Sequence, residues 1–218
     1  MAAGGKGQAT REAILAAAAA QFRVHGYGAS TLEDIATELG MTRAAVLYHF
    51  SSKEELLHAV VGPYLDALAA AVERHRVDER PSLAGRNLIV GFLDAAVAHD
   101  LAAGILFRDV TSWEQGTVRQ RVDACSSGFR DAMTGPEPTA EMRTLATCLL
   151  GALLRPLIDP KLDQTDPVVR AAILEVAFSI SRRIDRLRTA RSAPADRPLE
   201  PPPHAVLALV GNGSAPRI

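Results

Sequence analysis

Residues 26–57 read GYGASTLEDIATELGMTRAAVLYHFSSKEELL, and this stretch contains the start of three helices. Ser30 and Glu33 form a capping-box pattern, in which the serine hydroxyl accepts from the Glu33 amide and the Glu33 carboxylate reaches back to the Ser30 amide. The pattern predicts a helix that starts at Thr31. Gly40 then provides the backbone freedom for a sharp turn into the next helix.

Two further capping patterns follow this turn. Thr42 predicts the start of a second short helix. Ser52 and Glu55 form another capping box, and the apolar spacing after them predicts a long helix to about Val72. The Gly-Pro pair at 62–63 is expected to kink that helix, because proline cannot donate a hydrogen bond to the carbonyl one turn earlier.

One more helix is predicted before the capping box at Ser30. Apolar residues at Ile14, Ala18 and Phe22 recur at helical spacing, and Thr10 is predicted as the N-cap. Three short helices, the last two joined by a tight turn, form a helix-turn-helix unit, which can lay its second helix in the major groove of DNA. The same pattern is also typical of plain core packing in all-α proteins, so the pattern alone leaves both interpretations open.

The composition favours an all-α protein. The chain has 218 residues, of which 48% are hydrophobic and only 5% aromatic, and it is rich in alanine, the strongest helix former. About nine helices are expected in all, and the later five are predicted at 83–99, 101–111, 117–133, 139–157 and 167–187.

Several classes of protein are disfavoured by what the sequence lacks. Two cysteines are too few for a disulfide framework, and neither a signal-peptide core nor a sufficiently long apolar run is evident, so we expect a cytoplasmic location without a membrane span. No phosphate-binding loop, dinucleotide fingerprint or metal motif appears, so we expect no enzyme, catalytic residue, metal or cofactor. The net charge of −1 does not suggest a nucleic-acid partner.

The sequence itself nevertheless favours a nucleic-acid partner. It closely resembles the tetracycline-repressor (TetR) family in three segments: Gly26–Ala36, Leu39–Arg43 and His49–Leu57. The resemblance implies a transcriptional repressor that binds a palindromic double-stranded DNA operator as a homodimer and is released by a small-molecule effector. It also implies a DNA-binding domain (10–55, with the helix-turn-helix at about 31–50) and a helical ligand-binding and dimerisation domain (56–189). Composition adds a flexible N-terminus (1–9) and a proline-rich flexible tail (190–218).

Residue chemistry and the resemblance together indicate which side chains meet DNA. Arg43 lies in the first turn of the implied recognition helix and is the one long donor there that can bond bidentately to guanine. Lys53 is expected to bind a phosphate together with the backbone amides of a helix start. Thr42 is equally well explained as a simple N-cap, and burial against the long helix remains an alternative for Tyr48. The predicted DNA-binding residues are Ser30, Thr31, Thr42, Arg43, Ala44, Tyr48, His49 and Lys53.

The last two helices would form the dimer interface, as in the family. Two apolar stripes at helical spacing fit this role, although both are also consistent with packing inside one subunit. The predicted interface residues are Met142, Leu145, Leu149, Leu153, Val169, Ile173, Val176, Ile180 and Ile184.

The middle helices hold most of the large side chains of this aromatic-poor chain, and we predict the effector pocket there. Each of these residues is also explained as ordinary core. The effector is expected to be apolar or amphipathic. The long helix that follows Ser52 is expected to couple the effector pocket to the spacing of the two DNA-binding domains in the dimer, with Gly62–Pro63 as a hinge. The predicted pocket residues are Phe92, His99, Phe107, Arg108, Trp113, Cys125, Phe129 and Met133.

A helical protein that binds a small molecule or a partner but no longer reads DNA is the alternative. The family usually carries Tyr in place of Leu47 and often Gly in place of Ala44, and residues 1–55 hold 5 basic and 6 acidic side chains. Helix starts present amides to phosphates without formal charge, so this balance predicts weak non-specific binding with a shallow salt dependence. The apolar patch at 205–210 has no assigned role.

Overall fold

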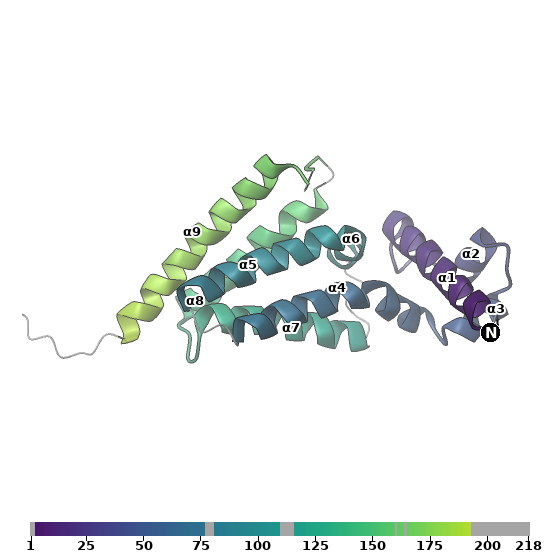
Figure 1. Ribbon diagram of the computed structural model, residues 1–218, viewed down its shortest axis with the longest axis horizontal. Helices are drawn as coiled ribbons and strands as arrows, with labels where there is room; N and C mark the ends of the chain where they lie inside the picture. The colour runs from purple at the N-terminus through teal and green to yellow at the C-terminus, as the bar shows by residue number, and fades with distance from the viewer. Residues whose placement is uncertain (1–2, 77–80, 110–115, 160, 164, 193–218) are drawn as a thin grey trace, which may run out of the picture.

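The computed structural model describes residues 3–76, 81–109, 116–159, 161–163 and 165–192. Within these residues every regular element is helical, which confirms the predicted all-α fold (Figure 1). The elements are α1 (Ala3–His25), α2 (Leu32–Glu38), α3 (Arg43–His49), α4 (Lys53–Arg76), α5 (Pro81–Ala98), α6 (Asp100–Arg108), α7 (Gly116–Thr134), α8 (Ala140–Leu154), the 3-10 helix η2 (Arg155–Ile158) and α9 (Pro167–Ser192).

Helices α1 to α3 form an N-terminal domain at one end of the elongated molecule, and α4 leads from it into the remaining helices (Figure 1). Phe22, Ile35 and Phe50 are at most 1% exposed and pack these three helices together. Gly40 has φ +62, a conformation that costs other residues free energy, and it turns the chain from α2 into α3 as predicted. The predicted helix-turn-helix is therefore present.

Two predicted helix starts are wrong. Helix α1 begins at Ala3 rather than after Thr10, so residues 3–9 are helical instead of flexible, and Gln8 and Glu12 hydrogen-bond across one of the turns so formed. The cap of α2 is Thr31 instead of Ser30, and the capping box joins Thr31 to Asp34. Ser30 does not cap α2 because its hydroxyl already donates to the carbonyl of Gly26 at 2.7 Å.

Helix α4 is continuous through Pro63 and longer than predicted. It contacts α1, α5 and α7, and a Cβ on Gly91 of α5 or Gly128 of α7 would lie only 3.2 Å from the nearest α4 side chain, so the two glycines allow close packing. By length and composition, α4 could span a membrane. Helices α5 and α6 pass the same test together, but a 94° bend separates them. Half of the apolar stretch of α4 is buried inside the protein. That burial marks α4 as a core helix.

The later helices match the predicted ranges closely, with differences at the end of α8 and at the end of α9, which is predicted to end at 187 but includes residues 190–192 of the predicted tail. The α-helix stops at Leu154 and continues as the 3-10 helix η2, because Pro156 has no N–H with which to extend the α-helical ladder. Thr139 caps α8 by accepting from the amide of Met142 at 3.2 Å. Helix α9 extends to Ser192, and the predicted tail beyond it, like Trp113, lies outside the described residues.

The predicted dimer stripes are mostly core. Helices α8 and α9 pack against each other within one chain, and the side chains between them fill that contact. Leu145, Val169 and Ile180 are half-buried, whereas Val176 is 51% exposed. The prediction is therefore wrong for five residues that lie at most 7% exposed inside this chain: Met142, Leu149, Leu153, Ile173 and Ile184.

Candidate nucleic-acid interface

The exposed start of α3 is the centre of the candidate interface. Thr42 caps this helix, and its hydroxyl oxygen accepts from the amide of Ala45 at 3.2 Å. Thr42, Arg43 and Ala44 at the start of the helix are all exposed, while Val46 in the next turn is fully buried. The packing of Val46 therefore fixes how α3 sits on the domain, and Arg43 in its first turn is left exposed.

Tyr48 extends the same exposed surface by one helical turn. Its side chain is 87% exposed, so burial against α4 is not its role. Its ring lies 5.2 Å from that of His49 in an edge-to-face arrangement, and His49 is half-buried. A phenol held on the surface by an aromatic neighbour supplies a hydroxyl donor of the kind that contacts DNA phosphates.

A hollow of about 430 Å³ lies beside α3 and brings several predicted residues together. Arg43 and Leu47 form one side, and the starts of α2 and α4 form the other. Leu47, where the resembled family usually has tyrosine, packs partly against the core instead of presenting a polar atom. The remaining lining residues are Ser30, Thr31, Leu32, Glu33, Ser51, Ser52 and Lys53.

Thr31 is exposed at the start of α2, but its polar atoms are already engaged. Its amide and hydroxyl both donate to Oδ2 of Asp34, at 2.9 and 2.7 Å, and these hydrogen bonds lower the pKa of the Asp34 carboxyl. Ser30 next to it is 2% exposed. The predicted DNA contact of Ser30 therefore cannot come from its side chain, because the hydroxyl is buried and donates to the carbonyl of Gly26.

Lys53 does not take its predicted role either. Its Nζ donates to three backbone carbonyls, those of Tyr27 at 2.8 Å, Ser30 at 2.8 Å and Gly28 at 3.4 Å. A lysine ammonium has three N–H donors, so the turn between α1 and α2 engages all of them. Burial lowers the pKa of Lys53, and the negative charge of Asp109 partly offsets this. Lys53 thus holds the turn in place instead of binding a phosphate.

Asp109, directly after α6, holds the same turn from the other side. Its Oδ2 accepts from the amide of Gly28 at 3.2 Å. Gly26 has φ +82, and a Cβ there would come within 2.9 Å of that oxygen, so glycine is required. The turn is therefore clamped between α4 and α6, and nothing in the local sequence of Asp109 signals this contact.

Arg11 is a cation near the interface that the sequence analysis missed. Its guanidinium lies 4.6 Å from the centre of the Phe50 ring, directly after α3, and its charge helps to lower the pKa of the nearby Glu55 carboxyl. Hydrogen bonds from Ser51 are the larger cause of that shift. A single arginine on a long amphipathic helix gives no sequence signal of such a position, because the contact is made across the tertiary fold.

The predicted effector residues fall into separate environments. The rings of Phe92 and Phe129 pack in the core in a tilted arrangement with their centres 4.5 Å apart, and Met133 is buried in the same core. Cys125 is buried, its thiol donates to the carbonyl of Leu65 at 3.6 Å, and burial raises its pKa. These residues have the packing of ordinary core.

His99 and Phe107 instead flank a side chain that the sequence analysis did not single out. The ring centre of Tyr64 lies 6.3 Å from that of His99 and 6.5 Å from that of Phe107. Tyr64 is fully buried, and its hydroxyl has no hydrogen-bond partner among the described residues. Arg108 lies elsewhere and donates to the carbonyl of Ile158 in η2 at 3.2 Å.

Known sequences match the N-terminal part of this chain. Residues 14–60 match the family described as "Bacterial regulatory proteins, tetR family". The HTH-type transcriptional repressor BepR of Brucella suis is 43% identical over 53 residues, which cover 24% of this chain and 25% of BepR. The HTH-type transcriptional regulator RutR of Escherichia coli K12 is 37% identical over 81 residues, 37% of this chain and 38% of RutR. The matches thus span a quarter to about two fifths of these relatives.

Comparison with solved structures extends the likeness to the whole fold. The ketosteroid transcriptional regulator KstR2 of Mycobacterium tuberculosis superposes with a TM-score of 0.62 at 18% identity, over 79% of this chain and 92% of that one. AibR, solved with isovaleryl coenzyme A and operator DNA, superposes with a TM-score of 0.60 at 20% identity, over 77% of this chain and 97% of that one. The body helices therefore share the fold of these regulators.

Proposed function

We propose that this chain, whose residues 14–60 match the tetR family of bacterial regulatory proteins, is a member of that family and a sequence-specific DNA-binding transcriptional regulator. We propose further that it acts as a homodimeric repressor in the cytoplasm, is released from DNA by a small molecule, and is not an enzyme. The observation that carries the proposal is the outward face of α3, where Thr42, Arg43, Ala44 and Tyr48 are all exposed.

Each of these side chains suits a contact in the major groove. The Arg43 guanidinium can donate two parallel hydrogen bonds to O6 and N7 of a guanine, and the methyl groups of Thr42 and Ala44 suit a thymine methyl. Tyr48 and His49, one turn later, suit the phosphates that flank these bases. Arg43 thus selects sequence, while Tyr48 and His49 position α3 along the groove.

The body supports a dimer through exposed residues of α8 and α9, of which only Val176 belongs to the predicted stripes. Thr144, Thr147 and Gly151 of α8 and Val176 of α9 are exposed, and a Cβ added at Gly151 meets no atom within 4 Å. Such small side chains allow the α8 and α9 helices of two chains to approach closely. A two-fold dimer would then present two α3 helices to successive half-sites, about 34 to 36 Å apart on the duplex.

Tyr64 supports an effector site in the body. A buried hydroxyl without a partner costs free energy, and a ligand that supplies an acceptor would remove that cost. The neighbouring rings of His99 and Phe107 suit the apolar part of such a ligand. An amphipathic effector with one hydrogen-bonding group therefore fits this region best.

Selection of bound fragments from the genome tests the DNA-binding proposal. Purified protein is expected to enrich a discrete palindromic sequence, and Arg43→Ala is expected to lose discrimination at one base pair by about 1 to 3 kcal/mol. Arg119→Ala is the matched control, because Arg119 is an exposed arginine of α7 whose partner Asp123 lies on the same helix. Failure to retain any fragment at low salt would overturn the proposal and leave a ligand- or partner-binding protein.

A further inference from the structure

Helix α4 contains a weak point at Gly62–Pro63, between the N-terminal domain and the body. Pro63 has no N–H, so the carbonyl of Ala59 receives no hydrogen bond from the helix at this point. Gly62 adds backbone freedom on the adjacent residue. A bend at this pair would change the direction in which α4 carries the N-terminal domain.

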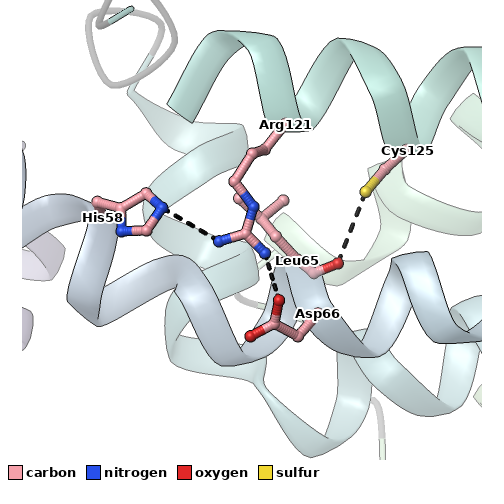
Figure 2. Close-up of polar contacts among 5 residues, drawn as sticks. All are labelled: His58, Leu65, Asp66, Arg121 and Cys125. Atoms are coloured by element: carbon pink, nitrogen blue, oxygen red, sulfur yellow. Dashed lines mark hydrogen bonds and ion pairs between the residues drawn. The ribbon is translucent and has the colours of Figure 1, made fainter. Parts of the chain in front are cut away.

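Arg121 of α7 contacts α4 on both sides of that weak point, as Figure 2 shows. Its Nη1 donates to Nε2 of His58 at 3.2 Å, and its Nη2 pairs with Oδ1 of Asp66 at 2.5 Å. Between these partners the guanidinium passes over Gly62, where a Cβ would lie 3.7 Å from Nη1. The side chain is 26% exposed, so it lies against the helix and not in open solvent.

The two partners are eight residues apart, which is about 12 Å along an α-helix. A planar guanidinium holds its donors at fixed angles, so both contacts persist only at one distance between His58 and Asp66. Bending α4 at Gly62–Pro63 changes that distance and breaks at least one of them. Arg121 therefore opposes a bend in either direction.

Helix α7 is itself anchored to the body half of α4. The Cys125 thiol donates to the Leu65 carbonyl, beside Asp66 (Figure 2), and Gly128 one turn further lies against Val72. These contacts fix α7 on the body side of the weak point. Among the hydrogen bonds of this cluster, only the one from Arg121 to His58 crosses to the side that carries the N-terminal domain, and the start of α7 also lies near that side, where a Cβ on Gly116 would be 3.8 Å from Oε1 of Glu54.

We propose that Arg121 is a positioning residue that braces α4 across Gly62–Pro63 and so sets the angle, and hence the separation, of the two DNA-binding domains in the dimer. The proposal rests on the proposed function. An effector that moves α7 away from α4 releases this brace and lets α4 bend, which uncouples the two half-site contacts. Arg121 itself touches neither DNA nor effector in this scheme.

The energetics distinguish this role from ordinary stabilisation. Asp66 is 76% exposed, and exposed ion pairs contribute little to the free energy of unfolding. Loss of Arg121 should therefore leave the fold intact and act on geometry. With two braces in a dimer, we expect the affinity for the natural operator to fall roughly three- to tenfold.

The test compares Arg121→Met with wild type in the full chain. Affinity is measured for the selected operator and for versions with one base pair added or removed between half-sites. The distance between the two N-terminal domains is measured by spin labels on Val24→Cys, an exposed site at the end of α1, in a Cys148→Ser background. Arg119→Met is the matched control, since its ion pair stays within α7.

We expect Arg121→Met to broaden the distance distribution and to reduce the preference for natural spacing, with an unchanged melting temperature. Arg121→Lys should behave like Arg121→Met, because one ammonium cannot span both partners. Gly62→Ala, whose Cβ would make an ordinary contact of 3.7 Å with Nη1 of Arg121, should narrow the distribution by stiffening α4.

Two results would overturn the brace. One is an Arg121→Met protein whose distance distribution and spacing preference equal those of Arg119→Met. The other is full recovery by Arg121→Lys, which would show that charge alone suffices. If wild-type protein retains no DNA, the proposed function fails, whereas either result above with normal wild-type binding defeats only the role of Arg121.

Discussion

Individual side chains of the N-terminal domain divide into those whose role the sequence predicts and those whose role depends on distant carbonyls. Thr42, Arg43 and Tyr48 are exposed as predicted, because Thr42 and Arg43 lie at the start of α3 and Tyr48 lies away from the buried Val46. Ser30 and Lys53 are not, since their partners are backbone carbonyls of the turn between α1 and α2. Sequence patterns identify donors, but they do not show which acceptors the tertiary fold brings near.

Lys53 gives a prediction at this scale. Lys53→Met keeps the side chain's length but leaves the carbonyls of Tyr27 and Ser30 without their charged donor, so we expect the free energy of unfolding to fall by about 1 to 3 kcal/mol. Urea unfolding measures this change. The exposed Lys161→Met controls for lost charge. A stable Lys53→Met protein whose DNA binding loses about one unit of salt slope would restore the phosphate role instead.

At the scale of single helices, amphipathic spacing predicts most element ranges well but does not say what covers an apolar face. The stripes of α8 and α9 have the periodicity of a dimer interface, yet Leu149, Leu153 and Ile184 are fully buried within one chain. Two stripes that face each other across a subunit contact have the same spacing as two that meet inside a subunit. Only the packing of α5 and α7 against these helices distinguishes the two cases.

The cap of α2 gives a prediction about pH. Hydrogen bonds from Thr31 lower the pKa of Asp34 in the folded state, so the ionised carboxylate stabilises the fold above its unfolded pKa of about 3.9. This contribution is lost as the pH falls through the lowered folded value. In urea unfolding at pH 6 wild type should therefore exceed Asp34→Asn in stability, and the gap should narrow toward pH 3.

Glu33→Gln serves as the control for that experiment, because it removes a carboxylate from the same first turn of α2. Its effect on stability should be smaller at pH 6 than that of Asp34→Asn. An equal effect of the two substitutions would show that the helix dipole, and not the capping box, accounts for the stabilisation.

For the whole molecule, net charge was the poorest guide. A chain at −1 with a slightly acidic N-terminal domain does not resemble a DNA-binding protein by composition. Composition averages over the whole chain, whereas Arg43 and Tyr48 are both exposed on α3 and the half-buried Lys53 donates to backbone carbonyls of the turn between α1 and α2. Specific affinity would then depend on a few placed contacts that two chains double, with little non-specific attraction.

Because two chains would double the DNA contacts, operator binding should depend on the dimer. Substitution of Val176 tests this dependence. The side chain is 51% exposed at the outward face of α9, so Val176→Arg should not disturb the core of one chain, but it would place two like charges together across a two-fold contact. We expect sedimentation to show a 23.2 kDa monomer with an unchanged helical circular dichroism spectrum and a loss of operator binding. Val24→Arg, at a 68% exposed valine of α1, is the control and should remain dimeric. A dimeric Val176→Arg protein would move the interface away from this face, and a monomeric variant that still binds the full operator tightly would show that one domain suffices.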